Sequence, residues 1–482
     1  MDAARDVGDV AAAASAEELR GSPAPAAVVA EDKHVFVGGN LGHAGRNLGQ
    51  RDVEARLDLG DGELAGLAHI DEQGALAHEL GGGDHIDFKR ERHGADCAWR
   101  GVLGKPEFAV DPGAPDRLVW LMSERFVVIM AGGRGERFWP ASRQTTPKHL
   151  LPIVGETPML TQTVERVTGV VPRENVFVIT TQAQLAGVRA ACPMLPAANL
   201  VAEPMGRDTA AATGLAMLLV KQRSPHAAFA MLPADHVIHD TAEYARLLGV
   251  AFAAAEADDV LVTLGIKPTE PATGFGYVEQ SGPWKNIAGR DVMAVKRFVE
   301  KPDLATAQGY LATGRYFWNA GMFVWRVPVV EAAFRAHAPE LHAGLAAMEA
   351  AAARAGWEQA LAEGYATLKK ISVDYAVMEK STNVVVVPAT FDWDDVGAWP
   401  AVANHFPKDS AGNVLRGLAM VEGGAGNIVV SRDGHLTSVV GASDLIVVTT
   451  ADATLVVPKD KAQDIKTLLK RLDVEASTKR FL

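Results

Sequence analysis

The chain has 482 residues, of which 48% are hydrophobic, so it is long enough for two or three domains and a large buried core. Its formal net charge of −12 argues against a surface built to bind nucleic acid or a membrane. Its two cysteines, Cys97 and Cys192, provide no disulfide framework, which is typical of a protein of the reducing cytoplasm. We find neither an apolar run long enough to span a membrane nor the basic and apolar regions of a signal peptide.

The first 121 residues differ from the rest of the chain. They contain 22 Asp and Glu against 12 Lys and Arg, whereas the remaining residues contain 37 and 35. Their apolar residues follow neither a helical nor a strand period for long, which argues against a well-defined fold. We therefore expect residues 1–121 to be an unstructured or spurious extension, with translation starting at Met122. A genuine regulatory domain is the alternative.

From Met122 onward, strand and helix patterns alternate, which predicts βαβ units around a mostly parallel sheet. The predicted strands are the short apolar runs at 126–130, 176–180, 200–203, 228–232 and 260–265. The predicted helices lie between them, at 158–169, 182–191, 208–222 and 241–256. Ligands of such sheets bind beyond the carboxyl ends of the strands, so we expect the site there.

The first predicted strand runs into a glycine-rich turn, Gly132-Gly133-Arg134-Gly135. Glycine lets a backbone turn tightly and approach a ligand, and successive N–H groups in such a turn form a concave anion site. Arg137, Arg143 and Lys148 add positive charge downstream. The pattern predicts a phosphate-binding loop, although it lacks the ending of a Walker loop and the spacing of a dinucleotide fingerprint. A plain glycine-rich turn on a basic surface is the alternative.

The segment 126–148, with Arg-Phe-Trp-Pro-Ala-Ser-Arg followed by Pro-Lys, resembles the signature of sugar-1-phosphate nucleotidyltransferases, and within them the mannose-1-phosphate guanylyltransferase branch. The resemblance runs from about Met122 to the C-terminus. It implies a Rossmann-like, mostly parallel mixed sheet with helices on both faces, in a catalytic domain over residues 122–405. It also implies a small left-handed β-helix-like domain with a C-terminal helix over residues 406–482. The implied substrates are GTP and mannose 1-phosphate, and the implied cofactor is Mg²⁺.

The same resemblance assigns the nucleotide-binding residues. They are Ala131, Gly132, Gly133, Arg134, Gly135, Glu203, Arg207 and Asp208. Glu203 ends a predicted strand, and its carboxylate can accept from both neighbouring donors of a guanine edge. Asp208 or Thr209 could instead cap the following helix, and the branch often has Asn where Asp208 stands, so the role of Asp208 stays open.

Two carboxylates are predicted to hold the metal. Asp235 ends another predicted strand, where a hard oxygen ligand suits Mg²⁺, although a capping role is the alternative. Asp395 matches the second metal carboxylate of the family, in a cluster with Asp392 and Asp394 whose charges repel unless something positive lies among them. We expect Asp235 and Asp395 to share one ion, with Asp394 supporting them. Together with Arg137 and Lys148, which would neutralise phosphate oxygens, they form the predicted catalytic set.

The resemblance assigns the sugar to four residues: Gly276, Glu300, Asn319 and Asp374. Glycines on both sides of Phe275 would let the backbone approach a ligand, although a β-turn explains them equally. Glu300 can accept hydrogen bonds from hydroxyls, and Asn319 can both accept and donate. Trp318 could stack on a ring or belong to the core.

The remaining segments predict structure rather than chemistry. Residues 341–355 predict a helix that packs on the core or faces a second copy in a homodimer. From Gly412 onward, strand-sized runs at short intervals suggest a small β-solenoid or sandwich. Residues 461–472 predict a closing amphipathic helix, for which an assembly role is favoured over catalysis.

The sequence thus predicts an enzyme that makes GDP-mannose and pyrophosphate from GTP and mannose 1-phosphate. One alternative is the same chemistry on glucose 1-phosphate with UTP or dTTP. Another is a non-catalytic subunit that senses nucleotide sugars, which need not keep all four catalytic residues. A fused phosphomannose isomerase half is not expected, because the part after Pro400 is short and lacks a His/Glu metal cluster.

Overall fold

The computed structural model describes residues 124–482 and seven strands between residues 28 and 102. The chain divides into two compact units, Met1–Met122 and Ser123–Leu482, and each is described by itself. The helices among the described residues include none that is both long and apolar enough to cross a membrane.

The strands of the first unit form one antiparallel sheet in chain order. They are β1 (Val28–Ala30), β2 (Lys33–Val35), β3 (Arg51–Asp58), β4 (Glu63–Ile70), β5 (Leu76–Glu79), β6 (His85–His93) and β7 (Asp96–Val102). The prediction of an unstructured extension did not anticipate these strands. Most of residues 1–121 lie outside the described residues, so a spurious or dispensable extension stays a prediction.

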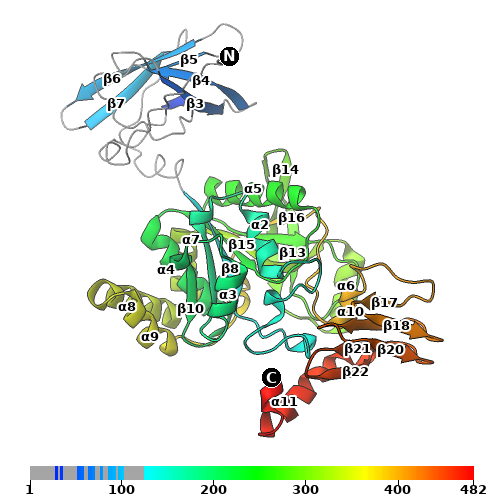
Figure 1. Ribbon diagram of the computed structural model, residues 1–482. Coiled ribbons are helices and arrows are strands. Elements are labelled where there is room, and N and C mark those ends of the chain that lie inside the picture. Colours follow the sequence, from blue (N-terminus) through cyan, green and yellow to red (C-terminus); the bar gives the residue numbers. More distant parts are fainter. Residues whose placement is uncertain are drawn as a thin grey trace, which may run out of the picture. The chain divides into compact units, whose positions relative to one another are not determined.

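The second unit is built on a nine-stranded mixed sheet in the order β10-β9-β8-β11-β15-β12-β16-β14-β13 (Figure 1). The strands are β8 (Arg125–Ala131), β9 (Val176–Thr181), β10 (Leu200–Glu203), β11 (Ala228–Pro233), β12 (Leu261–Ile266), β13 (Tyr277–Ile287), β14 (Arg290–Val299), β15 (Tyr316–Arg326) and β16 (Val384–Pro388). All five predicted strands are confirmed to within one or two residues. The parallel run β10-β9-β8-β11 meets β15, which lies antiparallel between β11 and β12.

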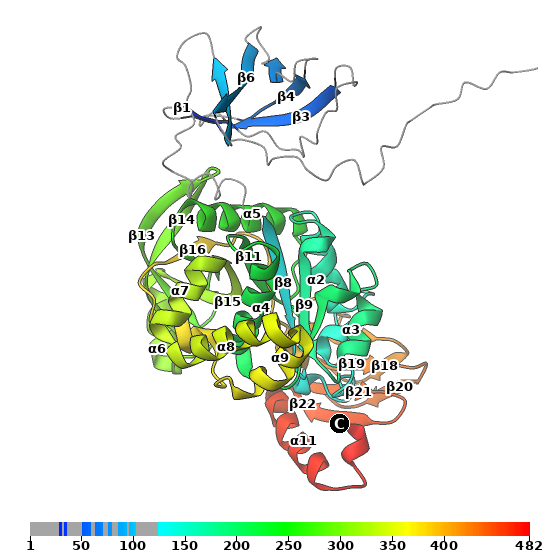
Figure 2. The ribbon, with the colours of Figure 1, turned by 90° about the vertical axis from the view of Figure 1, so that its left-hand side faces the viewer.

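Alternate side chains of each strand point to opposite faces of the sheet, and both faces are buried. In β8, Val127 and Ile129 belong to one core and Phe126 and Val128 to the other. The first core is completed by α2 (Met159–Val167), α3 (Leu185–Ala191), α5 (Thr241–Ala257) and α6 (Leu304–Thr313). The second is completed by α4 (Asp208–Arg223), α7 (Val327–His337), α8 (Pro339–Ala355) and α9 (Trp357–Gly364). Figure 2 shows the two helical layers on either side of the sheet.

Helix α8 packs within the chain, as one of its two predicted roles requires. Its buried residues are Leu341, Leu345 and Met348. Leu345 rests on Gly214 of α4, where an added Cβ would lie 2.5 Å from the Leu345 Cδ1. Packing on the chain's own core therefore accounts for the apolar face of α8.

Residues from 414 onward form the β-helix-like domain that was predicted. Strands β17 (Val414–Arg416), β19 (Ile428–Ser431) and β21 (Leu445–Thr449) stack in parallel, and β18 (Ala419–Glu422) pairs in parallel with β20 (Thr437–Val440). Strand β22 (Thr454–Pro458) then returns antiparallel to β21, and α11 (Ile465–Val474) follows. Short helical turns connect the elements of the second unit: η1 (Glu136–Phe138), η2 (Lys148–Leu150), η3 (Arg173–Asn175), η4 (Ala197–Asn199), η5 (Tyr365–Thr367), η6 (Asp374–Met378), α10 (Trp399–Val402), η7 (Lys459–Asp464) and η8 (Lys479–Phe481).

A third core joins this domain to the glycine-loop segment. Phe138 and Trp139 pack there with Ile428, Ile446 and Ile465 of the C-terminal domain. The Trp139 indole N–H also donates to the backbone oxygen of Phe481 at 2.8 Å. The two domains thus share a hydrophobic core next to the predicted phosphate site.

Candidate active site

The glycine loop follows β8 and lies over Lys148. Gly135 has φ 60°, and an added Cβ there would lie 2.5 Å from the Lys148 Cβ, so the position requires glycine on both counts. The Ser142 hydroxyl donates to the Gly135 carbonyl at 2.7 Å. The loop is therefore held against the segment that supplies the lysine.

Lys148 links the two segments that carry the predicted metal carboxylates. Its side chain is 5% exposed. Its Nζ donates to the Asp235 carboxylate at 3.0 Å, to the Asp235 backbone oxygen at 2.8 Å and to the Asp395 backbone oxygen at 2.6 Å. An ammonium group has three N–H donors, and all three are engaged. In this conformation Lys148 organises the carboxylates, and contact with a phosphate would require Nζ to give up one of these bonds.

Asp235 and Asp395 are brought together by a short antiparallel bridge. The Val237 amide donates to the Asp394 carbonyl at 2.9 Å, and the Asp394 amide donates back at 3.1 Å. Asp235 precedes this bridge and Asp395 follows it, so both lie at the same edge of the sheet. The Asp394 carboxylate is engaged elsewhere, with the Val396 amide at 2.6 Å and His405 Nε2 at 3.1 Å.

The two carboxyl groups have opposite pKa shifts. For Asp235, desolvation would raise the pKa, but the charges of Lys148 and His236 outweigh it and hold the pKa at about 2. For Asp395, burial raises the pKa. The charges of Asp394 and Asp235 also raise it, whereas Lys148 and Arg137 lower it, and the net shift is upward. Within residues 124–482 no protein group donates a hydrogen bond to the Asp395 carboxylate. That carboxylate is therefore available to a cation.

Arg137 lies beside Asp395. Its Nη1 donates to the Gly397 carbonyl at 3.0 Å, and its Nε is buried and has no hydrogen-bond partner within residues 124–482. An added Cβ on Gly397 would lie 3.0 Å from an Asp395 carboxylate oxygen and 3.5 Å from Arg137 Nη1. The lack of a side chain at Gly397 lets the guanidinium and the carboxylate approach each other.

These residues border one cavity of about 450 Å³. It is lined by Arg134, Gly135, Glu136, Arg137, Phe138, Lys148, Asp235, His236, Asp395, Gly397 and Lys466. All four predicted catalytic residues are among them. The mixture of cations and carboxylates is suited to a charged, metal-associated ligand such as a polyphosphate.

The predicted base end lies on the other side of the glycine loop. Glu203 is 7% exposed, and its Oε1 lies 3.9 Å from where a Cβ on Gly132 would be. Burial raises the pKa of Glu203 to about 7. The Tyr365 hydroxyl is buried next to Glu203, and burial raises its pKa, to which the charge of Glu203 and the hydrogen-bonding interaction with it add. This end of the site thus holds a desolvated carboxyl group beside a buried tyrosine hydroxyl.

The neighbouring Arg207 and Asp208 serve the backbone in this structure. Arg207 donates through Nη2 to the Ala366 carbonyl. Asp208 has φ 67°, a left-handed conformation that Asp and Asn tolerate better than most residues. Its side chain accepts from the Thr209 amide at 2.8 Å. Asp208 therefore shapes the turn that starts α4.

The four predicted sugar-binding residues also come together. The backbone N–H of Asn319 donates to the Gly276 carbonyl at 2.8 Å, and its side-chain Nδ2 donates to Asp374 Oδ1 at 2.9 Å. A Cβ on Gly276 would collide with Glu300 Oε2. That oxygen is buried and has no hydrogen-bond partner in the described part of the chain, while the other carboxylate oxygen pairs with Lys301. Burial and the charge of Glu300 raise the pKa of Asp374 to about 6.

Trp318 belongs to the core. It is 6% exposed and packs 5.1 Å, centroid to centroid, from Phe275, which in turn lies 5.4 Å from Trp393. This aromatic cluster packs beside the sugar end.

The comparison with known proteins divides the second unit into the same two parts, the domain with the nine-stranded sheet and the C-terminal β-helix-like domain. Residues 126–411, more than half of the chain, match the nucleotidyl transferase family, and residues 421–472 match the MannoseP isomerase/GMP-like beta-helix domain. The chain belongs to the nucleotidyl transferase family.

Several relatives are similar over most of the chain. The xanthan biosynthesis protein XanB of Xanthomonas campestris pv. campestris (strain B100) is 39% identical over 360 residues, which cover 73% of this chain and 74% of that protein. The mannose-1-phosphate guanylyltransferase of Escherichia coli is 36% identical over 341 residues, covering 70% and 72%. A crystal structure of "mannose-1-phosphate geranyltransferase" from Thermus thermophilus is 35% identical, with a TM-score of 0.65, and covers 73% of this chain and 99% of that one.

His236 and Lys466 are among the lining residues that the sequence did not assign to the site. His236 follows Asp235, and the Trp393 indole N–H donates to its Nδ1 at 3.1 Å. Lys466 comes from α11, the helix that was assigned an assembly role. From the sequence, His236 could be a hydrogen-bond donor or a mere neighbour of Asp235, and nothing local distinguishes Lys466 from the other lysines of an amphipathic helix.

Proposed function

We propose that this nucleotidyltransferase is a mannose-1-phosphate guanylyltransferase, which converts GTP and mannose 1-phosphate to GDP-mannose and pyrophosphate. The observation that carries the proposal is one cavity in which Arg137, Lys148, Asp235 and Asp395 converge. The relatives named mannose-1-phosphate guanylyltransferase support this choice of substrates.

The reaction needs no covalent enzyme intermediate. An oxygen of the sugar phosphate attacks the α-phosphorus of GTP in line, and the bond from that phosphorus to the bridging oxygen breaks, so that pyrophosphate leaves with the electron pair. Charge on the phosphates is the main barrier, and positioned cations lower it. Arg137, whose Nε has no hydrogen-bond partner among the described residues, would donate to the phosphates. Cys192 is no nucleophile here, because it is buried and burial raises the pKa of its thiol to about 12.

Asp235 and Asp395 would hold a divalent cation, for which we propose Mg²⁺. The donor set fits, since both are hard oxygen ligands and the Asp395 carboxylate has no protein donor among residues 124–482. The described residues contain no cluster of three or more His, Cys, Asp or Glu able to hold a metal. Substrate oxygens and water would complete the coordination, as is usual for Mg²⁺. When bound, the ion would neutralise charge on the phosphates.

The two ends of the substrate pair would lie on either side of this cavity. Guanine would use the Glu203 carboxylate, which can accept from its ring N–H and its amino group. The sugar hydroxyls would use Glu300, whose buried Oε2 has no hydrogen-bond partner among residues 124–482, together with Asn319 and Asp374. A buried acceptor without a partner costs about 1–3 kcal/mol, so a hydroxyl placed there would be stabilised.

Location and assembly are also proposed. Two cysteines and no disulfide framework favour a cytoplasmic enzyme. Its net charge of −12 favours no nucleic-acid or membrane partner. A homodimer stays a prediction, which light scattering of the purified protein would measure.

The deciding experiment is a pyrophosphate-release assay with four nucleoside triphosphates and two sugar phosphates. We expect the highest kcat/KM for GTP with mannose 1-phosphate. Preference for UTP or dTTP with glucose 1-phosphate would select the other member of the family, and no release with any pair would favour a sensing subunit. The Asp395→Asn variant is the matched control for contaminating activity.

A further inference from the structure

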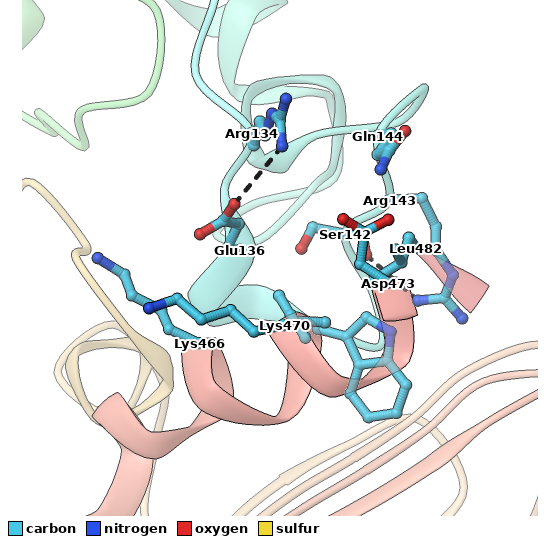
Figure 3. Close-up of a pocket in the computed structure, with 11 residues that line it drawn as sticks. Arg134, Glu136, Ser142, Arg143, Gln144, Lys466, Lys470, Asp473 and Leu482 are labelled. Carbon is cyan, nitrogen blue, oxygen red and sulfur yellow. Dashed lines mark hydrogen bonds and ion pairs between the residues drawn. The ribbon is translucent and has the colours of Figure 1, made fainter. Parts of the chain in front are cut away.

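A helix of the C-terminal domain borders the catalytic cavity. Lys466 of α11 lines the cavity of about 450 Å³ together with Arg137, Asp235 and Asp395. It also lines an adjoining cavity of about 210 Å³, in which Lys470 takes part as well. Figure 3 shows both lysine side chains extending from α11 to the side on which Glu136 lies, away from Arg143. The two domains therefore share a wall of the active site.

Apolar contacts hold α11 in this place. Ile465, directly before Lys466, is 2% exposed and lies in the core that contains Phe138 and Trp139. Leu468, Leu469 and Leu472 pack against the same core. Because Phe138 and Trp139 belong to the segment that also carries Arg137, the position of Lys466 is coupled to the glycine loop.

Lys466 differs from the other cations of the cavity in having no partner among the residues that the structure describes. Lys148 has used all three of its donors, Arg137 donates to Gly397, and Arg134 lies 4.0 Å from Glu136. Lys466 is exposed, and within residues 124–482 it makes neither an ion pair nor a hydrogen bond. Its charge is thus available to an anion that enters the cavity.

The position of Lys466 indicates which part of the substrate it meets. Glu203 at the base end and Glu300 at the sugar end are both outside the lining of this cavity. The remaining parts of the substrate pair are the triphosphate of GTP and the phosphate of mannose 1-phosphate, and the triphosphate carries the larger negative charge. A lysine ammonium is a compact charge that suits phosphate oxygens.

We propose that Lys466 binds the β- and γ-phosphates of the nucleotide, which leave as pyrophosphate, so that the C-terminal domain supplies a substrate-binding residue. This inference rests on the proposed function. It replaces a purely assembling role for the closing helix by a direct part in the reaction.

The test is the Lys466→Gln variant, which removes the charge and keeps a good helix former of similar length. The loss of one charged contact should raise KM for GTP about tenfold. In the reverse reaction with GDP-mannose, KM for pyrophosphate should rise by the same factor. KM for mannose 1-phosphate should stay unchanged, and Lys466→Arg should restore most of the affinity.

Lys470→Gln is the matched control, because Lys470 lies one turn further along α11 and lines only the adjoining cavity. It should leave all three KM values unchanged, and both variants should keep the wild-type melting temperature. An unchanged KM for GTP and pyrophosphate in Lys466→Gln would overturn the inference. Equal losses in both variants, or a loss for every substrate with a lower melting temperature, would also overturn it.

The wild-type assay separates this inference from the proposed function. If the wild-type protein releases no pyrophosphate from any substrate pair, the proposed function fails. Calorimetric binding of inorganic pyrophosphate to the wild-type protein and to Lys466→Gln then still tests the lysine. Equal binding by the two proteins, or binding by neither, would count against it.

Discussion

The phosphate cavity and the sugar end both use partly buried carboxyl groups, but the groups carry opposite pKa shifts. At the phosphate cavity, Lys148 and His236 hold the pKa of Asp235 at about 2. At the sugar end, burial and the charge of Glu300 raise the pKa of Asp374 to about 6. Desolvation acts in the same direction on both, so the difference comes from the sign of the nearest charge. A carboxylate that stays ionised suits a metal ion, whereas a pair of crowded carboxyl groups suits neutral hydroxyls.

The largest effect should follow from removing a carboxylate at the phosphate cavity. Asp235→Asn and Asp395→Asn should each lower kcat by about 10²- to 10³-fold at saturating GTP, because charge stabilisation in the transition state is lost. The double variant should be little worse than either single one, since ligands of one ion act as a unit. Two small effects that multiply in the double variant would separate the two residues and break the shared-ion assignment.

The base end provides a third carboxyl group for the comparison, since burial raises the pKa of Glu203 to about 7. Glu203→Gln replaces one of the two acceptor oxygens with an NH₂ donor, which would then face a guanine donor. This mismatch costs about 1–3 kcal/mol. The kcat/KM for GTP should fall relative to the other triphosphates. Unchanged relative values across the four nucleotides would remove Glu203 from the base pocket.

At the sugar end we expect an effect confined to one substrate. Glu300→Gln removes the charge next to Asp374 and weakens the acceptor at the buried Oε2, which should raise KM for mannose 1-phosphate about tenfold. KM for GTP serves as the internal control and should not change. Equal increases for both substrates would mean that the two ends are not separate.

The two regions should differ in pH dependence, with a change of a few-fold in KM for mannose 1-phosphate. With a pKa of about 6, Asp374 takes up a proton as the pH falls below 6 and then accepts less well from Asn319. KM for mannose 1-phosphate should therefore rise between pH 7 and 5, whereas Asp235, with a pKa of about 2, stays ionised throughout. The step should disappear in Asp374→Asn, and its persistence there would assign it to another group.

The smallest effect is expected from removing residues 1–121. The phosphate cavity, the base end and the sugar end all lie within residues 124–482. A chain that starts at Met122 should thus keep kcat, both KM values and the melting temperature of the second unit. Loss of activity or aggregation of the shortened chain would show that the first unit is needed.

Local signals in the sequence determined most of the parallel half of the sheet. The runs that became β8, β9, β10, β11 and β12 are apolar and bounded by turn residues, and both properties can be read within a few positions. The glycines of the loop and Asp235 at the end of β11 were identified for the same reason. The four sugar-end residues came from the resemblance to a family, and the structure brings them together.

Only the tertiary structure decided the features that depend on pairing between distant segments. The insertion of β15 between β11 and β12 follows from antiparallel hydrogen bonds that no local pattern announces. The three bonds of Lys148 depend on the bridge between Val237 and Asp394, which joins two segments far apart in the chain. Lys466 reaches the cavity because Ile465 is buried against Phe138 and Trp139. Hydrophobic periodicity reports that a helix has an apolar face, but the surface that covers this face is chosen only when the whole chain packs.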